Sequence, residues 1–99
     1  MTIRKTKKEN TLVISLEGRL DSLTASDLKE ELKSSLDGVA TLIFDLEELE
    51  YISSAGLRVL LMAQKTMDQL SGEMKVCHVN ETVAEIFEVT GFSDFLTIE

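Results

Sequence analysis

The chain has 99 residues, which is the usual length of one domain with a single, modest hydrophobic core. Its 43% hydrophobic and 28% charged residues indicate an ordinary folded domain and exclude intrinsic disorder. Ten basic and eighteen acidic residues give a net charge of −8, which argues against binding to nucleic acid phosphates or to an anionic membrane surface.

The chain begins with a predicted hairpin. Residues 2–7 have the polar composition of an edge strand, and residues 8–10 form a turn. Over residues 11–17 apolar and polar side chains alternate, as in a strand with one buried face. We interpret the basic side chains near the start as a charged edge that blunts aggregation, with a partner contact as the alternative.

A helix and a buried strand are predicted next. Residues 22–37 repeat apolar side chains at helical spacing, and Gly38 is a natural stop. Thr24 and Asp27 are spaced much like a capping box. Residues 40–46 form the continuous apolar run that is typical of a parallel strand buried on both faces.

The second half continues this alternation of helix and strand. A broadly apolar helix is predicted over residues 54–72, followed by a strand over residues 74–79. Asn80 then caps a third helix that Gly91 closes, and residues 95–98 form a short last strand.

The predicted order of elements is therefore β-β-α-β-α-β-α-β. Strand–helix–strand units with short loops pair in parallel through right-handed crossovers, whereas the first two strands form an antiparallel hairpin. We predict an α/β fold, a small mixed sheet with helices packed against it. In such sheets functional groups collect at the carboxyl ends of the strands, which here hold residues 18–22, residues 47–54 and Asn80.

The residues offer little support for catalysis or a cofactor. The only histidine, His78, is predicted to lie within a strand with Cys77 on the opposite face, so the two should not share a dyad or a metal ion. One cysteine and one histidine also fall short of a structural zinc set. Because no glycine-rich phosphate loop is present either, we expect no enzyme, no cofactor and no metal site.

Acidic residues crowd the segment after the third predicted strand, at Asp45, Glu47, Glu48 and Glu50. A magnesium site is one interpretation of this cluster. A solvated acidic loop is the commoner explanation, and we favour it.

The sequence gives no indication of export or membrane insertion. No stretch approaches the roughly 20 apolar residues of a membrane span, and no apolar segment follows the basic start. The lone Cys77 cannot form an internal disulfide, which suits a reducing compartment. We expect a single cytoplasmic domain over residues 1–99, monomeric when free.

Two adjacent serines, Ser53 and Ser54, stand at the predicted junction between a strand end and an apolar helix. A serine there can cap the helix, which is worth about 1 kcal/mol, and on physical grounds alone this is the simpler interpretation. The functional interpretation is phosphorylation. A phosphate would add about −1.5 to −2 charges beside the positive end of the helix dipole, which the fold would tolerate and a docked partner would not.

At these residues the sequence resembles the STAS domain, and specifically the bacterial anti-sigma factor antagonists of the sporulation and stress-response type. Residues 16–21 look like the family's L-x-G-x-L-D turn. Residues 42–49 look like its buried strand, which leads into the serine motif over residues 52–57. Residues 72–74 and 89–92 also fit its closing elements, so the resemblance covers essentially the whole chain.

The resemblance implies a partner-switching protein that is not an enzyme. In this family the unphosphorylated antagonist binds an anti-sigma factor, usually a serine kinase, and thereby frees a sigma factor. The kinase phosphorylates the antagonist, which breaks the complex, and a PP2C-type phosphatase reverses the modification. The match places the phosphorylated serine at Ser54 and the family's nearby acidic residue at Asp21. Many members have Asp where this sequence has Ser53. Either that acidic role is dispensable here, or Asp45 or Asp21 supplies it, or Ser53 is itself an acceptor. We favour Ser54 over Ser53 because Ser54 occupies the aligned position beside the helix cap.

We predict a partner-contacting surface around the serine motif that comprises Arg19, Asp21, Ser22, Ser53, Ser54, Gly56 and Arg58. For Arg58 the alternative is an ordinary solvated side chain. Two other functions remain open from the sequence. One is a STAS module serving another regulatory or transport system, and the other is a nucleotide-binding domain, against which the missing phosphate loop argues.

Overall fold

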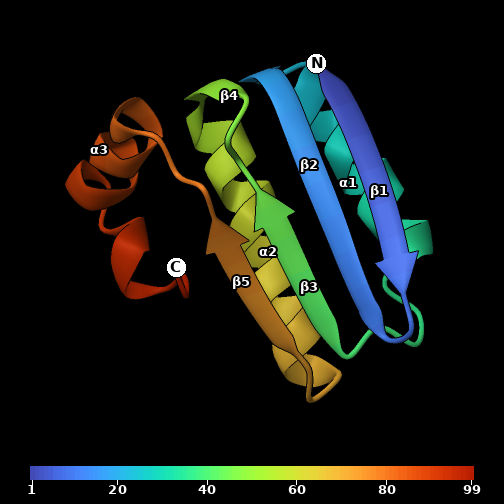
Figure 1. Cartoon of the computed structure of the whole chain (residues 1–99). Helices are drawn as coiled ribbons and strands as arrows, with labels where there is room; N and C mark the ends of the chain where they lie inside the picture. Colours follow the sequence, from blue (N-terminus) through green and yellow to red (C-terminus); the bar gives the residue numbers. More distant parts are fainter.

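The structure, a computed structural model, describes residues 1–99 and consists of a twisted mixed sheet with two helices on one face and a third at one edge (Figure 1). In chain order the elements are β1 (Thr2–Lys8), β2 (Thr11–Leu20), α1 (Thr24–Ser35), β3 (Thr41–Asp45), β4 (Leu49–Ile52), α2 (Ser54–Gln69), β5 (Glu73–Cys77), α3 (Glu81–Val89) and the short 3-10 helix η1 (Phe92–Asp94). No helix combines the length and the apolar run that crossing a membrane would require.

The sheet confirms the predicted mixture of antiparallel and parallel pairing. The strand order is β1-β2-β3-β5, with β1 antiparallel to β2 and the remaining pairs parallel. β2 is long enough to pair twice along one side: residues 11–15 pair with β3, and residues 18–20 pair with β4. The register shifts between Gly18 and Arg19, where Gly18 adopts a left-handed φ of 104°.

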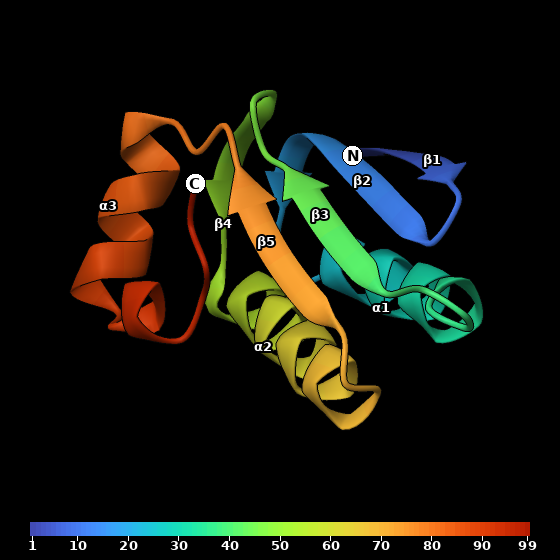
Figure 2. The same cartoon turned by 60° about the horizontal axis from the view of Figure 1, so that its bottom comes forward.

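The core lies between the sheet and helices α1 and α2, which Figure 2 shows beneath the same face of the sheet. The predicted apolar stripe of α1 is confirmed, because Ala25, Leu28, Leu32 and Leu36 are all buried. They join the inward side chains of β2 and β3 in one cluster of 24 residues that contains no polar or charged side chain.

The expectation that residues 40–46 form a strand buried on both faces is wrong. In β3 only the alternate residues Leu42 and Phe44 are buried, and the neighbours that point the other way are partly exposed. No helix covers that second face, as Figure 1 shows. The apolar run therefore reflects strand propensity as well as burial.

Two differences from the predicted order concern short strands. Residues 49–52, expected as part of an acidic loop, form β4 because the overhanging end of β2 offers unpaired backbone groups. Residues 95–98, expected as a strand, instead follow η1 and make one isolated bridge between Val76 and Ile98. The helices were also predicted to end too late, at residues 37 and 72, whereas α1 ends at Ser35 and α2 at Gln69.

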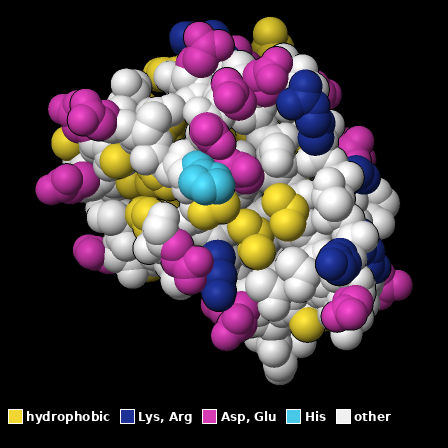
Figure 3. Space-filling view, viewed as in Figure 1, with side chains coloured by type: hydrophobic (Ala, Val, Ile, Leu, Met, Phe, Trp, Pro, Cys, Tyr) yellow, Lys and Arg dark blue, Asp and Glu magenta, His cyan; other side chains and the backbone are white.

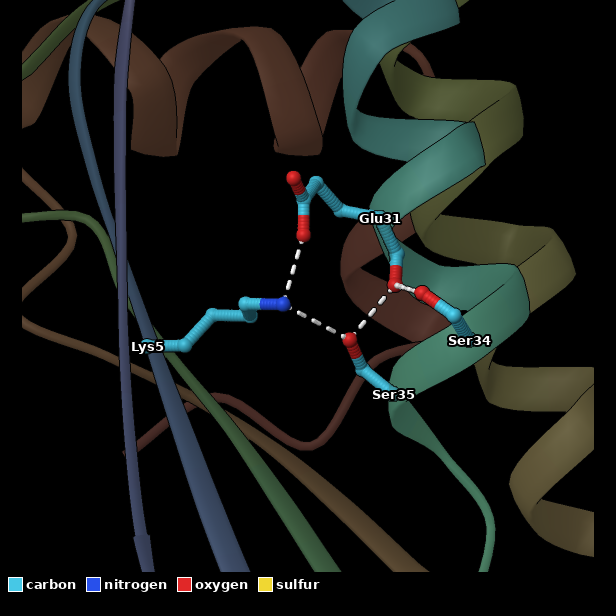
Figure 4. A network of polar contacts seen from close by, with 4 residues as sticks. All are labelled: Lys5, Glu31, Ser34 and Ser35. Carbon is cyan, nitrogen blue, oxygen red and sulfur yellow. Dashed lines mark hydrogen bonds and ion pairs between the residues drawn. The ribbon is translucent and has the colours of Figure 1, made fainter.

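The basic edge strand is joined to α1 through Lys5. Lys5 Nζ reaches from β1 to the last turns of α1, 2.6 Å from Glu31 Oε2 and 3.1 Å from Ser35 Oγ (Figure 4). The Ser35 and Ser34 hydroxyls both donate to the Glu31 carbonyl. A cation also suits the negative end of the helix dipole, so these contacts favour the structural interpretation of the basic start.

Asn80 links the third helix to the sheet. Its side-chain oxygen accepts from Val83 N (2.9 Å), which confirms the predicted cap, and its amide nitrogen donates to the Leu49 carbonyl (2.6 Å). The same side chain therefore starts α3 and holds that helix against β4. Gly91, with a φ of 79°, follows the helix and confirms the predicted stop.

We expect Asn80→Ala to lower the free energy of unfolding by about 1–2 kcal/mol, because it removes the cap and leaves the Leu49 carbonyl without its donor. Asn80→Asp is the matched control for the two roles, since it keeps the cap acceptor but replaces the donor with a carboxylate. Urea unfolding of the three proteins measures the effect. An Asn80→Asp variant as stable as the original would show that the bond to Leu49 contributes nothing.

Candidate functional site

The predicted functional residues meet at the carboxyl ends of β2 and β4. We call this region the serine edge and define it as residues 19–24 of the β2–α1 turn together with residues 51–58 of the β4–α2 junction. Parallel pairing places Leu20 opposite Ile52, and Ser53 N donates to the Leu20 carbonyl (2.8 Å). Both helix starts are therefore held side by side by the end of a single strand pair.

The two serines have different structural positions. Ser53 is the cap of α2: its backbone is extended, and its Oγ accepts from Gly56 N at 3.2 Å. Ser54 is the first residue of the helix, its side chain is exposed, and no hydrogen bond uses its hydroxyl in the structure. The fold thus needs the hydroxyl of Ser53 and leaves that of Ser54 available.

Asp21 organises the start of α1. Its Oδ1 accepts from Leu23 N and Thr24 N, both at 3.0 Å, while Asp21 N donates to Thr24 Oγ1 at 2.9 Å. This is a reciprocal capping box, and it lies three residues before the one expected at Thr24 and Asp27, which was wrong. The hydrogen bond from Thr24 N is the main reason that the pKa of the Asp21 carboxyl is lowered.

The remaining predicted contacts lie on the surface of the serine edge or beneath it. The Arg19 guanidinium stacks 4.4 Å from the centroid of the Tyr51 ring, across the β2–β4 pair. Ser22 and Arg58 are exposed. Gly56 is buried: a Cβ at this position would lie 2.7 Å from Leu20 Cγ, so Gly56 shapes the site from below instead of offering surface to a partner.

Sequence reasoning missed two side chains at this edge. Leu23 lies next to Asp21 and Ser22 and, at 82% exposure, is the most exposed of the six large apolar side chains at the surface. The sequence could have indicated this exposure, because Leu23 does not belong to the apolar stripe of α1 that is buried. Tyr51 was missed because its segment was expected to be a loop, where no cross-strand partner could be assigned.

A second group of polar side chains lies at the carboxyl ends of β3 and β5. β5 ends at Cys77, and His78 adopts a left-handed φ of 56°, so its Nδ1 lies 3.0 Å from Asp45 Oδ1 and 3.7 Å from Cys77 Sγ. The expectation that Cys77 and His78 point apart in a continuous strand is therefore wrong. The hydrogen bond with Asp45 raises the pKa of His78, and burial is the main cause of the raised pKa of Cys77.

Only one residue of the acidic segment after β3 belongs to either region. Asp45 belongs to the second group, where its Oδ1 also accepts from Glu47 N at 3.1 Å. Glu47, Glu48 and Glu50 are exposed, and none of them joins Asp45 in a group of three converging ligand atoms. The group that does converge consists of Asp45, Cys77 and His78, whose ligand atoms all lie within 4.8 Å of one another.

Comparison with known proteins identifies the family. The model of the STAS domain matches residues 2–99. The chain is 39% identical over 93 residues to BtrV of Bordetella bronchiseptica, provisionally named an anti-sigma factor antagonist, covering 93% of this chain and 80% of BtrV. It is 26% identical over 99 residues to the anti-sigma-B factor antagonist of Staphylococcus aureus, covering 99% and 92%.

Solved structures show the same fold. The anti-sigma factor antagonist SpoIIAA in its unphosphorylated form superposes with a TM-score of 0.86 at 20% identity, covering 99% of this chain and 88% of that one. The phosphorylated form of SpoIIAA from Bacillus gives a TM-score of 0.78 at 19% identity, covering 99% and 91%. These likenesses confirm the predicted α/β architecture.

We expect Gly56→Ala to lower the free energy of unfolding by about 1–2 kcal/mol. A methyl group would overlap the buried side chains of Leu20 and Ile52, and this overpacking outweighs the helix propensity gained. Ser54→Ala, an exposed change in the same helix, is the control and should stay within about 0.5 kcal/mol. Chemical denaturation measures both, and a Gly56→Ala protein as stable as the original would contradict the close packing.

We expect the Asp21 cap to contribute stability that depends on pH. Because the folded pKa is lowered from 3.8, the carboxylate contributes above that value and loses its contribution as the pH falls through the folded pKa. Asp21→Asn keeps an oxygen acceptor, so the variant should melt below the original near about pH 7, and the difference should shrink as the pH falls below 3.8. Asp27→Asn removes a charge from the same turn without removing these bonds and is the control. A difference in melting temperature that is constant with pH would contradict this account.

Proposed function

The chain belongs to the STAS domain family, and from that premise we propose that it is a cytoplasmic anti-sigma factor antagonist whose binding is controlled by phosphorylation of Ser54. The proposal rests on the different roles of two adjacent serine hydroxyls at the start of α2. Ser53 supplies the helix cap, whereas Ser54 presents an exposed hydroxyl that makes no hydrogen bond within the fold. A modification of Ser54 therefore changes the surface without removing a structural contact.

The physical setting of Ser54 suits a phosphate. The first turn of a sixteen-residue helix has free backbone N–H groups and the positive end of the dipole, which favour negative charge. Arg58 lies four residues further along the same helix and therefore on the same face, within reach of a phosphate on Ser54. A phosphate on Ser53 would instead replace the hydroxyl that accepts from Gly56 N. This difference supports Ser54 over Ser53.

The partner we propose is an anti-sigma factor with serine kinase activity, and a PP2C-type phosphatase would restore the unmodified state. Support comes from the relatives, which are named for antagonism of anti-sigma factors, and from the phosphorylated form known for SpoIIAA. The chain itself would perform no catalysis. Phosphorylation adds about −1.5 to −2 charges to an interface that a docked kinase would otherwise desolvate.

The docking surface we propose is the serine edge with its exposed apolar and aromatic side chains. Tyrosine and arginine, which form the stacked pair Tyr51 and Arg19, are among the residues that dominate binding energy in protein interfaces. Leu23 adds exposed apolar area beside them. Arg58 continues this surface, because it lines a shallow groove along α2 together with Leu61, Met62 and Lys65. Asp21 and Ser22 complete the contact from the β2–α1 turn.

We expect Ser54→Ala to bind the cognate kinase but to take up no phosphate, and Ser54→Asp to bind it at least about tenfold more weakly because a charge enters the interface. Incubation with the kinase and ATP, followed by fragmentation mass spectrometry, locates the phosphate. Calorimetry measures the affinity.

Ser53→Ala is the matched control for the acceptor. It should lose about 1 kcal/mol of stability from the missing cap yet still be phosphorylated at Ser54. Full phosphorylation of Ser54→Ala, or loss of phosphorylation only in Ser53→Ala, would assign the acceptor to Ser53. A kinase that binds Ser54→Asp as tightly as the original would contradict the switch.

A further inference from the structure

The pairing of β3 with β5 brings three different metal-ligating side chains together. The parallel register sets Asp45 directly opposite Cys77, so both side chains leave the sheet on the same face. The backbone then turns at His78, whose left-handed φ of 56° directs the ring back over the two strand ends. An oxygen of Asp45 thus lies close to the sulfur of Cys77 and a nitrogen of His78, although Asp45 and His78 are 33 residues apart in the chain.

The separations fit a tetrahedral metal ion. Zinc bonds of about 2.3 Å to sulfur and about 2.0–2.2 Å to nitrogen and oxygen require ligand atoms about 3.4–3.6 Å apart at tetrahedral angles. Here His78 Nδ1 lies 3.7 Å from Cys77 Sγ and 3.0 Å from Asp45 Oδ1. Changes of a few tenths of an ångström in side-chain position therefore suffice to admit the ion.

The surroundings also have the features of a metal site. Glu47 N donates to Asp45 Oδ1, which orients the carboxylate in the way that outer hydrogen bonds orient metal ligands. Besides burial, the carboxylates of Asp45, Glu99 and Glu47 raise the pKa of the Cys77 thiol, so the surroundings of the site are negatively charged. Figure 3 shows the single histidine ring, in cyan, at the surface with acidic side chains beside it. The left-handed backbone of His78, which Glu9 and Ser71 also adopt, turns the ring toward the two strand ends.

We propose that Asp45, Cys77 and His78 form a binding site for one Zn²⁺ ion, in addition to the phosphorylation switch of the serine edge. A mixed nitrogen, sulfur and oxygen set suits zinc and its analogue Co²⁺, whereas Mg²⁺ prefers oxygen ligands alone. Three protein ligands leave the fourth position to water, as in open zinc sites. On binding, the Cys77 thiol loses its proton to solvent, and neutral His78 coordinates through Nδ1 with its proton on Nε2.

The presence of one cysteine and one histidine makes the test direct. Calorimetric titration of the reduced, metal-free protein with Zn²⁺ should give one ion per chain, and Mg²⁺ should not compete. Bound Zn²⁺ should slow the reaction of the Cys77 thiol with a maleimide. Co²⁺ should give the intense visible absorption of a tetrahedral complex and a thiolate-to-metal charge-transfer band.

Three single changes remove one ligand each. Cys77→Ser, Asp45→Asn and His78→Asn should each weaken Zn²⁺ binding at least about tenfold, since even changes in the outer shell cost about 10–100-fold. His78→Asn is chosen because Asn tolerates a left-handed backbone, which protects the fold. Asp37→Asn, an exposed change after α1, removes the same charge as Asp45→Asn and should leave binding unchanged.

Several results would overturn the proposal. The proposal is wrong if Zn²⁺ does not bind saturably at one ion per chain, or if two chains share one ion through Cys77 alone. It is also wrong if the original protein and His78→Asn bind Zn²⁺ with equal affinity. Circular dichroism of each variant shows whether it is folded. Because Ser54 and its kinase take no part in these measurements, failure of the zinc site would leave the proposed phosphorylation switch untouched.

Discussion

The structure depends above all on the length of β2. This ten-residue strand pairs with β1 along one side, and on its other side it pairs first with β3 and then with β4. Because β3 stops short, the last residues of β2 would otherwise expose unpaired backbone groups next to a buried leucine, Leu20. β4 satisfies them, and the start of α2 is thereby placed beside the start of α1.

The serine edge separates a hydroxyl group that stabilises the fold from one that is left on the surface. The junction carries two hydroxyl groups in succession, and hydrogen bonding assigns them opposite roles: Ser53 is committed to the helix start and Ser54 is free. Burial of Gly56 against Leu20 and Ile52 fixes the helix close to the sheet, so this geometry has little room to relax. A charge added at Ser54 would therefore affect the binding of a partner at this surface more than the packing of the core.

The two polar regions of the carboxyl edge arise from different physics. At the serine edge the groups are those of two helix starts, where backbone N–H groups and dipoles favour anions. At the ends of β3 and β5 the groups are side chains of Asp45, Cys77 and His78, whose chemistry and acidic surroundings favour a cation. The proposed phosphorylation site and the proposed zinc site thus lie on the same edge of one sheet.

Much of the fold was predictable because it depends on residues within one or two turns of each other. The apolar stripe of α1, the hairpin, the Asn80 cap and the stop at Gly91 are local patterns of side-chain spacing and backbone preference. The same local signals located the serine pair at a helix start, and the resemblance in its motif indicated the family.

Tertiary structure alone decided which backbone groups are left to be paired and where the chain turns between elements. β4 forms because β2 extends beyond the end of β3. A single bridge at Ile98 replaces the predicted last strand, and Asp21 caps α1 in place of Thr24. His78 faces Asp45, 33 residues away, because its backbone leaves the strand with a left-handed φ. Sequence by itself determined the three helices, the hairpin, the strands β3 and β5 and the serine motif. The convergence of distant side chains could be decided only by strand register and backbone direction, since neither is set by local spacing.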